Sequence, residues 1–520
     1  MAVFPFFRLC LCCTQCQYLE DKKMERYHAG IRCPERTYGG KQQMKILYVG
    51  SEALPFASTG GLGDVLGALP AAVKRALGEG GDVRVVIPMY RCIKEQYLSR
   101  CTFVCQTEVW LSWRRQYMGI FSCEKDGVLY YFIDNEYYFY RPALYGDYDD
   151  GERFAYFSAA VLKLMACVDF YPDVLHANDW QSALSVIYLK RQFAQREEYR
   201  HIRAVYTIHN IAYQGVYGFE TLEDLFGLGA WDHGIVEYNG DINLTKGAIV
   251  CADRVTTVSP QYAKEICMPY YAHGLHHILQ MYREKVCGIV NGIDTAYYNP
   301  ASDVELAAHY DADHPAGKVR CKTALEELCG FASSASTPIV AMISRLAAHK
   351  GFDLVMRVID EMLQDDMRFV LLGTGEDGIA QFMQGLQARH GDKVKVFLCY
   401  DKALSKQIYA GADVFLMPSQ SEPCGLSQMI ASRYGTVPVV RETGGLYDTI
   451  KPYDALTHNG NGFTFANYNA HEMMDAVRRA LALYRDADAW AACVETCMRT
   501  DFSWNASAAQ YVQMYEDLTR

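Results

Sequence analysis

Hydrophobic residues in this chain gather in short continuous runs, and longer stretches with a helical pattern separate the runs. Six runs form a first set, at residues 46–49, 83–87, 129–133, 174–176, 205–208 and 255–258. Five form a second set, at residues 339–343, 369–372, 396–398, 414–417 and 437–440. Continuous hydrophobicity is typical of strands buried on both faces, and therefore of parallel sheets covered by helices. The two sets predict two doubly wound, Rossmann-like α/β domains.

The length of the chain supports this division, because 520 residues are more than a single hydrophobic core usually organises. The pattern allows the boundary anywhere in a polar, mixed region at about 287–336. Residues 1–43 differ from the rest, since they hold a cluster of cysteines and show no periodic pattern. We expect them to form an extra N-terminal segment without a catalytic role, either disordered or added by a mis-assigned start.

The composition of the chain limits which partners it can bind and which cellular compartment it is expected in. The formal net charge of −11 argues against nucleic acid or an anionic membrane as the main partner, because both would repel an acidic surface. The sequence has no uninterrupted run of about 18 apolar residues, so it predicts no membrane span. The nineteen cysteines are mostly scattered singly, which is typical of reduced thiols in a cytoplasm. A phosphate-bearing small ligand is still compatible, because a few local cations can dominate one site.

One short motif occurs twice, once in each predicted domain. Thr-Gly-Gly-Leu stands at 59–62 and again at 443–446, each time after a strand and at the start of a helical pattern. Glycines let the backbone approach a ligand, and the N–H groups at a helix start favour anions. For either copy alone, an ordinary strand-to-helix turn is the preferred interpretation. Together they favour two Rossmann-like halves that face one ligand-binding cleft.

Two permanent cations follow the predicted strand at 339–343. Arg345 and Lys350 lie five positions apart at the carboxyl end of this strand. Arginine grips a phosphate with two hydrogen bonds, and lysine supplies a mobile point charge. Such a pair can hold a diphosphate and offset the charge that develops as it leaves. The alternative interpretation is a solvated loop.

A carboxylate follows the predicted strand at 414–417. Glu422 lies in a loop between a proline and a glycine, and a helical pattern begins beyond it. Its carboxylate can accept hydrogen bonds from sugar hydroxyls, while Leu426 and Ser427 offer backbone N–H groups to a phosphate. Alternatively, Glu422 merely sits near a helix N-terminus, where negative charge is favoured.

Polar clusters end two neighbouring strands of the first set. His176, Asn178 and Asp179 end one strand, and His209 and Asn210 end the next. A lone histidine is more often structural than catalytic. Two clusters at neighbouring strand ends favour a site, because the carboxyl ends of parallel strands line the cleft. We therefore expect His209 to bind the transferred sugar and Asp179 to orient its neighbours.

Taken together, these segments resemble the bacterial glycogen synthase and plant starch synthase family. The resemblance runs from Met44 almost to the C-terminus. It is carried by the segments 51–52, 59–62, 178–180, 207–215, 290–294, 344–346, 350–351, 411–413, 422–426 and 443–446. Their order over some 475 residues is very specific, although no single segment decides it.

The resemblance implies a two-Rossmann glycosyltransferase of the GT-B architecture. It implies an acceptor-side domain at 44–287, a nucleotide-sugar domain at 288–500, and a final helix at 501–520 that crosses back to the first domain. The implied donor is ADP-glucose and the implied acceptor is an α-1,4-glucan, with retention of the anomeric configuration. No metal and no cofactor are implied. The oligomeric state stays open.

The resemblance also implies roles for single residues. Arg345 and Lys350 would hold the diphosphate and assist its departure, while Glu422, Asp179 and His209 would surround the glucose. The expected substrate-binding residues are Ser58, Gly60, Gly61, Asp64, Tyr145, Asn210, Asn291, Tyr400, Cys424, Gly425, Leu426, Ser427 and Thr443. Among these, Tyr145 and Tyr400 match positions that contact the adenine.

One departure from the family concerns the first glycine loop, which usually begins with lysine. This chain has Ser58 there. The loss of one cation beside a diphosphate weakens binding by about 1–3 kcal/mol if nothing compensates, so the preference between ADP and UDP donors is open. The alternative functions are a UDP-sugar-dependent transferase of the same fold and a non-catalytic glucan-binding homologue.

Overall fold

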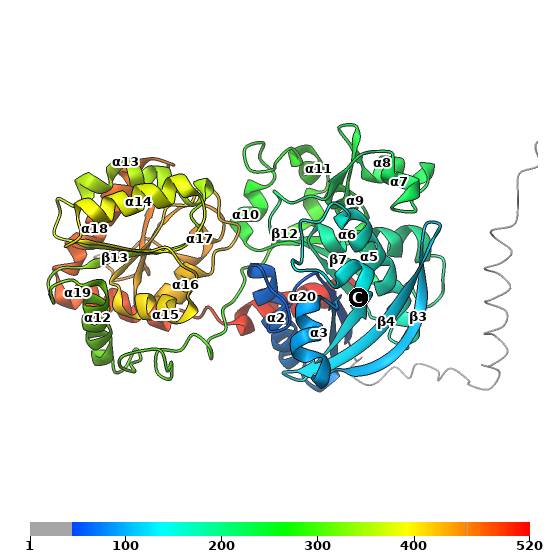
Figure 1. Ribbon diagram of the computed structural model, residues 1–520, viewed down its shortest axis with the longest axis horizontal. Coiled ribbons are helices and arrows are strands. Elements are labelled where there is room, and N and C mark those ends of the chain that lie inside the picture. Colours follow the sequence, from blue (N-terminus) through cyan, green and yellow to red (C-terminus); the bar gives the residue numbers. More distant parts are fainter. Residues whose placement is uncertain (1–43, 455) are drawn as a thin grey trace, which may run out of the picture. The chain divides into compact units, whose positions relative to one another are not determined.

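A computed structural model describes residues 44–454 and 456–520 of the chain (Figure 1). The predictions made for residues 1–43 lie outside the described residues. The described part contains two large sheets, called here the first and second sheet, and a small three-stranded sheet. None of the helices in these two ranges is long and apolar enough to cross a membrane.

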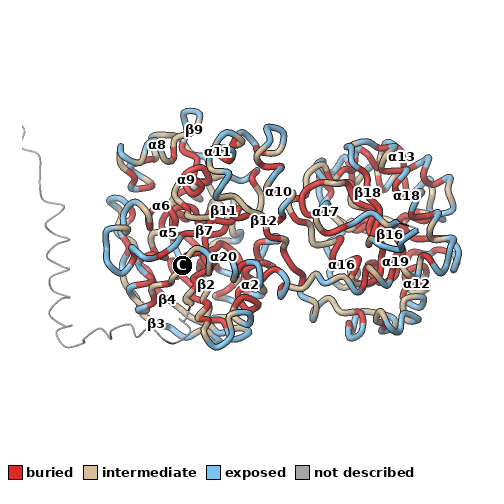
Figure 2. Tube along the Cα trace, turned by 180° about the vertical axis from the view of Figure 1, so that it is seen from behind, coloured by how far each residue is buried: buried red, intermediate tan, exposed pale blue. Residues whose placement is uncertain are grey.

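The first sheet has nine strands in the order β12-β11-β7-β6-β1-β2-β5-β4-β3. The predicted strands are confirmed as β1 (Met44–Val49), β2 (Gly81–Pro88), β5 (Val128–Asp134), β6 (Val174–Asn178), β7 (Arg203–Ile208) and β11 (Arg254–Thr257). These six strands pair in parallel. Their residues are almost entirely buried, as Figure 2 shows, which is why the sequence carries them as continuous apolar runs.

The prediction of a purely parallel first sheet was wrong at one edge. The strands β3 (Thr102–Leu111) and β4 (Arg114–Lys125) form an antiparallel hairpin, and β4 pairs antiparallel to β5. In β3, Glu108 and Trp110 are exposed, whereas the alternating residues Val109 and Leu111 are buried. This alternation marks a sheet with one solvated face. The short edge strand β12 (Val286–Gly288) was also not predicted.

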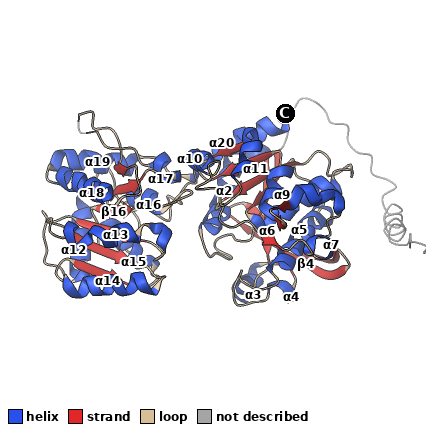
Figure 3. Ribbon diagram, turned by 90° about the horizontal axis from the view of Figure 1, so that it is seen from above, coloured by secondary structure: helices blue, strands red, loops and turns tan. Residues whose placement is uncertain are grey.

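The second sheet has six strands, all parallel, in the order β15-β14-β13-β16-β17-β18. They are β13 (Ile339–Ile343), β14 (Arg368–Leu372), β15 (Val394–Phe397), β16 (Val414–Met417), β17 (Val437–Arg441) and β18 (Phe463–Phe465). The strand predicted at 396–398 begins two residues earlier, and the three-residue β18 is too short to stand out in the sequence. Figure 3 shows helices on both sides of these strands, so the doubly wound fold class is confirmed.

Helices connect the strands and cover the sheets. Around the first sheet these include α2 (Gly61–Leu77), α3 (Arg91–Tyr97), α5 (Asp150–Cys167), α6 (Trp180–Tyr188), α9 (Leu244–Cys251) and α10 (Pro260–Glu265). Around the second they include α12 (Ala316–Cys329), α13 (Phe352–Met362), α14 (Asp377–Arg389), α15 (Lys402–Gly411), α16 (Ser427–Arg433), α17 (Gly444–Thr449), α18 (Ala470–Tyr484) and α19 (Ala487–Arg499). Several of these helices have an N-cap side chain. In α15, for example, the carboxylate of Asp401 accepts the backbone N–H of Leu404.

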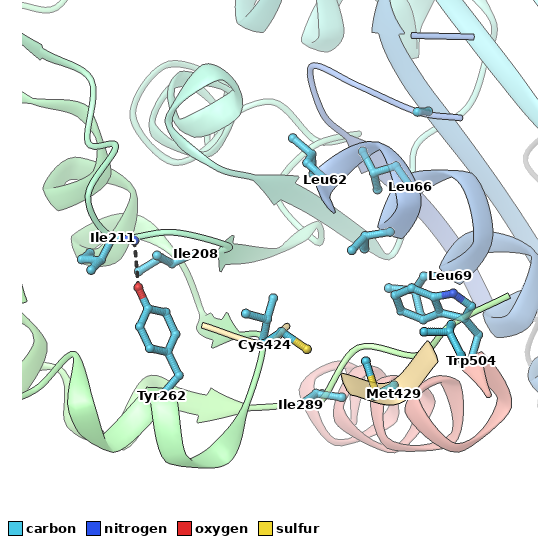
Figure 4. Packing of buried hydrophobic residues seen from close by; sticks show 14 of the residues in the cluster. Leu62, Leu66, Leu69, Ile208, Ile211, Tyr262, Ile289, Cys424, Met429 and Trp504 are labelled. Carbon is cyan, nitrogen blue, oxygen red and sulfur yellow. Dashed lines mark hydrogen bonds between the residues drawn. The ribbon is translucent and has the colours of Figure 1, made fainter. Parts of the chain in front are cut away.

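One buried hydrophobic cluster runs through both sheets and their helices. Figure 4 shows part of it, where Leu66 and Leu69 of α2, Met429 of α16 and Trp504 all belong to the cluster. Trp504 begins the last helix, α20 (Trp504–Thr519). Burial of apolar surface therefore links elements that are far apart in the sequence.

The last helix is hydrogen-bonded to the interior of the first sheet. The Tyr515 hydroxyl lies 2.8 Å from the hydroxyl of Tyr48 in β1 and 2.6 Å from Nδ1 of His176 in β6. The other ring nitrogen of His176 lies 2.5 Å from the hydroxyl of Thr207. Desolvation lowers the pKa of His176 to about 3, so this ring is neutral and structural. The boundaries expected at 287/288 and 500/501 stay predictions.

We predict that Tyr515→Phe lowers the free energy of unfolding by about 1–3 kcal/mol, because it leaves two buried polar groups without their partner. Urea denaturation followed by circular dichroism measures the change. Tyr148→Phe is the matched control, since Tyr148 is 96% exposed. Equal stability of the two variants would contradict the structural role given to Tyr515.

Candidate active site

Two loops lie side by side at the carboxyl edge of the second sheet, because β13 and β16 pair in parallel. Residues 344–351 follow β13 and residues 418–427 follow β16. We call the second the catalytic loop, after the role that the sequence predicts for Glu422. The N–H of Gln420 donates to the carbonyl of His349 at 2.9 Å. Gly351 has a φ of +80°, and an added Cβ there would overlap the carbonyl oxygen of Pro418. The two loops are therefore in direct contact.

An ion pair joins the predicted phosphate cation to the predicted sugar-binding carboxylate. Lys350 Nζ lies 2.7 Å from Oε2 of Glu422, and the Ser419 hydroxyl donates to the same oxygen at 3.0 Å. Glu422 is buried, Lys350 is half-buried, and Arg345 at the start of the same loop is exposed. Desolvation and the charges of Lys350 and Arg345 lower the pKa of His349, which Glu422 partly opposes. These groups form a compact cationic site around one carboxylate.

The turn after Glu422 leads into helix α16. Cys424 is buried, and desolvation raises its thiol pKa to about 12, so the thiol stays protonated. Leu426 is the N-cap of α16 and Ser427 its first residue, with Gly425 before them at positive φ. The structure thus places the backbone N–H groups of Leu426 and Ser427 at the helix start, as the sequence predicted.

In the first sheet, β6 and β7 bring Asp179 and His209 together. Oδ1 of Asp179 accepts the backbone N–H of His209 at 2.8 Å. Asp179 has a φ of +57°, which is uncommon for a residue other than glycine and is often found at functional sites. Desolvation of its carboxylate raises the pKa of Asp179 to about 7, although the backbone N–H groups that it accepts oppose this shift.

The protonation of His209 follows from its neighbour. The side-chain N–H₂ of Asn178 donates to the carbonyls of Val49 and His176, each at 3.2 Å, so its oxygen faces the other way. That oxygen lies 2.9 Å from Nε2 of His209, which must donate to it. Desolvation lowers the pKa of His209 to about 4. The ring is therefore neutral, and its Nδ1 can accept a hydrogen bond from a sugar hydroxyl.

The first glycine motif is organised by Glu52. Its carboxylate accepts the N–H groups of Thr59 and Gly60 at 2.6 and 3.2 Å, and the hydroxyls of Thr59 and Tyr145 at 2.7 and 2.6 Å. In this structure the buried carboxylate of Glu52 occupies the N–H groups of Thr59 and Gly60, and the predicted binding of substrate by Gly60 and Gly61 stays a prediction. An added Cβ at Gly60 or Gly61 would meet no atom within 4 Å, so the space beside the motif is open.

The second glycine motif holds a carboxylate in the same way. Oε1 and Oε2 of Glu265, at the end of α10, lie 3.0 and 3.1 Å from the N–H of Gly444. They also lie 3.3 and 3.2 Å from the hydroxyl of Thr443. The hydroxyl of Thr443, a residue predicted to bind substrate, is therefore directed to Glu265 in this structure.

Known protein families match the parts of the chain that form the first and the second sheet. The family described as the starch synthase catalytic domain matches residues 45–281, and the glycosyl transferases group 1 family matches residues 331–492. A glycogen synthase from Bacillus cereus (strain Q1) is 45% identical over 477 residues, which are 91% of this chain and 100% of the relative. One from Geobacillus thermodenitrificans is 47% identical over 481 residues, 92% of this chain and 98% of the relative. The chain belongs to the bacterial glycogen synthase and starch synthase family. It is accordingly a glycosyltransferase with glycogen synthase function.

Two solved structures have the same fold as this chain. The catalytic domain of Starch Synthase IV from Arabidopsis thaliana, bound to ADP and acarbose, is 34% identical to this synthase and superposes with a TM-score of 0.82. The match covers 92% of this chain and 100% of that domain. A sucrose-phosphate synthase from Thermosynechococcus elongatus, 18% identical with a TM-score of 0.57, shows the fold alone.

The remaining predicted residues of this synthase lie at several places. Asp64 is in the first turn of α2, where desolvation raises its pKa to about 6 and the nearby Lys402 of α15 lowers it. Tyr400 is 81% exposed and, with Lys402, lines a pocket of about 630 Å³. Asn291 lines a different pocket, and its buried Oδ1 has no hydrogen-bond partner. Their roles in substrate binding stay predictions.

Three further predicted residues make local contacts. The hydroxyl of Tyr145 donates to Glu52 and lies 2.7 Å from that of Ser51. The side-chain oxygen of Asn210 accepts the N–H of Ala212 at 3.0 Å and closes a turn. The Ser58 hydroxyl is exposed and donates to the carbonyl of Gly60 at 3.2 Å. Tyr145 is thereby tied to the glycine motif rather than left exposed.

Sequence reasoning assigned no role to Glu52 or Glu265. Glu52 precedes its motif by seven residues, whereas Glu265 precedes Thr443 by 178, so no common spacing connects them. A signal was nevertheless present, because two copies of one motif require two similar partners.

Asp179 makes the stability of this synthase depend on pH. Between about pH 4 and 7 the folded chain keeps a proton on Asp179 that the unfolded chain has released, so this group's contribution to stability falls as the pH rises. We predict that Asp179→Asn makes the fall in unfolding free energy over this range shallower, by up to about 1.4 kcal/mol per pH unit. Urea denaturation at several pH values measures it. The exposed Asp126→Asn should keep the slope of the parent, and an unchanged slope in Asp179→Asn would refute the assignment.

Proposed function

We propose that this synthase transfers glucose from ADP-glucose to the non-reducing end of an α-1,4-glucan, with retention of the anomeric configuration. The observation that carries the proposal is the contact between Lys350 and Glu422 at the carboxyl edge of the second sheet. A cation that can bind phosphate and a carboxylate that can bind hydroxyls are therefore close enough to contact the same donor molecule. The ADP bound to the related Starch Synthase IV supports an adenine nucleotide.

Arg345 and Lys350 take the diphosphate of the donor in this proposal. Without donor, Glu422 neutralises Lys350. When the diphosphate binds, Lys350 turns to it, and Glu422 is released to accept hydrogen bonds from glucose hydroxyls. As the bond between the anomeric carbon and the phosphate oxygen breaks, the two cations offset the negative charge that accumulates on ADP. No metal or cofactor takes part in this scheme.

The acceptor attacks from the side on which the phosphate leaves. A bond forms between the acceptor hydroxyl oxygen and the anomeric carbon, and the hydroxyl proton passes to the departing phosphate. This front-side displacement retains the configuration without a protein nucleophile. Asp179 and His209 contact the glucose, with Nδ1 of His209 as an acceptor. A trapped covalent glucosyl-enzyme would refute this route.

The first test is incorporation of labelled glucose into glycogen from ADP-glucose and, in parallel, from UDP-glucose. We expect incorporation from ADP-glucose, and Lys350→Ala should lower kcat by roughly 10²–10³-fold, as removal of a charge-stabilising group does. The exposed Lys163→Ala serves as the control and should keep the activity of the parent. Incorporation from UDP-glucose alone would show that the donor is UDP-glucose and not ADP-glucose. A folded protein that incorporates neither sugar would be a glucan-binding homologue.

Ser58 generates a separate prediction about donor affinity. The Ser58→Lys variant restores a cation beside the open space at the first glycine motif. It should tighten ADP binding by about 1–3 kcal/mol, or roughly 5–150-fold in Kd. Calorimetric titration with ADP measures this, and Ser58→Gln controls for side-chain length. Unchanged affinity in Ser58→Lys would show that the diphosphate lies out of reach of this position.

A further inference from the structure

Helix α10 contacts both halves of the proposed site. Near its start, the hydroxyl of Tyr262 accepts the N–H of Ile211 at 3.1 Å, the dashed contact in Figure 4. Ile211 lies two residues after His209. At its end, Glu265 accepts the N–H of Gly444, the first residue of α17, which follows β17 of the second sheet. One six-residue helix is therefore bonded to the loop that carries His209 and to the second glycine motif.

The second glycine motif is in turn packed on the catalytic loop. The N–H of Gly445 lies 3.1 Å from the carbonyls of Glu422 and Pro423. Gly444 has a φ of +45°, and an added Cβ there would overlap the carbonyl oxygen of Glu422. An added Cβ at Gly445 would overlap the carbonyl oxygen of Cys424. Any movement of Gly444 is thus transmitted directly to the backbone of Glu422.

The segment after α10 holds the catalytic loop from a second side. The side-chain N–H₂ of Gln420 donates to the hydroxyl of Tyr270 at 2.6 Å. Arg441 donates to the carbonyl of Gln420 at 2.7 Å and to the hydroxyl of Tyr271 at 3.3 Å. The loop that presents Glu422 to Lys350 is therefore bonded directly to Tyr270 and, through Arg441, to Tyr271.

Contact between α10 and α17 is reciprocal. Asp448 of α17 accepts the N–H of Gln261, in the first turn of α10, at 2.8 Å. Glu265 of α10 accepts the N–H of Gly444, the first residue of α17. Each helix thus supplies a carboxylate to the N-terminus of the other, where negative charge is favoured. Among the described residues, Asp448 is hydrogen-bonded to Gln261 and to no residue of the catalytic loop, so its contact can be removed separately from that of Glu265.

We infer that Glu265 is a positioning residue of the transfer reaction, which acts through Thr443 and Gly444 to set the backbone of Glu422 against Lys350. Glu265 itself does not touch the reacting groups. Its carboxylate is buried and accepts hydrogen bonds from Thr443, Gly444 and Gln261, and the charge of Arg441 also acts on it. In Glu265→Gln, an N–H₂ group replaces one of the two accepting oxygens and faces the donors of the Thr-Gly-Gly turn, so the catalytic loop shifts. The inference rests on the proposed role of Glu422 and Lys350.

The test compares Glu265→Gln with Asp448→Asn in the full-length chain. Glu265→Gln should lower kcat by 10–100-fold at temperatures well below its melting temperature, while the donor KM changes less than threefold. A displacement of about 1 Å in a catalytic group is enough for such a loss. Asp448→Asn should lower the melting temperature and keep kcat within twofold. An equal loss of kcat in both variants, or none in Glu265→Gln, would overturn the inference.

Hydrogen–deuterium exchange gives a readout that does not depend on activity. In Glu265→Gln, amides of residues 418–427 should exchange faster than in the parent, and those of β14 should not change. If the parent transfers glucose from neither nucleotide sugar, the proposed function fails, and exchange still decides whether Glu265 holds the loop. Unchanged exchange at 418–427 would overturn the inference whatever the activity.

Thr443 supplies a second pair of variants if Glu265→Gln does not fold. Thr443→Val removes the hydroxyl that donates to Glu265, and Thr443→Ser keeps it. The valine variant should lose kcat at constant donor KM, and the serine variant should stay within twofold of the parent. A raised donor KM in Thr443→Val would place Thr443 on the substrate itself and overturn the route through Glu265.

Discussion

Burial of three glutamates constrains the geometry of the whole site. Glu52, Glu265 and Glu422 are each less than a tenth exposed. A buried carboxylate costs several kcal/mol unless hydrogen-bond donors or cations surround it. Each of these side chains therefore fixes the groups that satisfy it: two glycine turns for Glu52 and Glu265, and Lys350 for Glu422. The backbone around the site is held by this requirement before any ligand is present.

The need to neutralise buried carboxylates also bears on how an acidic protein binds an anionic donor. The chain carries a net charge of −11, yet Arg345 and Lys350 concentrate positive charge after one strand. Because Glu422 already neutralises Lys350, a diphosphate gains that cation only by exchange with a carboxylate. In the proposed function, Ser58 stands where the family usually has a lysine, so Arg345 and Lys350 are the cations expected to hold the diphosphate.

Sequence patterns predicted the parallel strands well and the polar network poorly, for physical reasons. A strand such as β6 is buried on both faces, so its run of apolar residues is visible without knowledge of its neighbours. The β3–β4 hairpin is solvated on one face, and its alternation was missed. Arg345, Lys350 and Glu422 could be proposed because they lie in loops that follow strands, and the structure joins two of them, Lys350 and Glu422, in an ion pair. Glu265 was not, because its partner Gly444 is 179 residues away and becomes adjacent only in the fold.

Short helices explain why such distant residues depend on each other. The helices α10 and α17 have six residues each, and helices of this length are not stable alone in water. Each receives at its N-terminus a carboxylate from the other, Asp448 in one direction and Glu265 in the other. Neither helix is therefore complete until both are in place. Because the loop of Glu422 packs on α17 and the loop of His209 is bonded to α10, the two loops become ordered by the same contact.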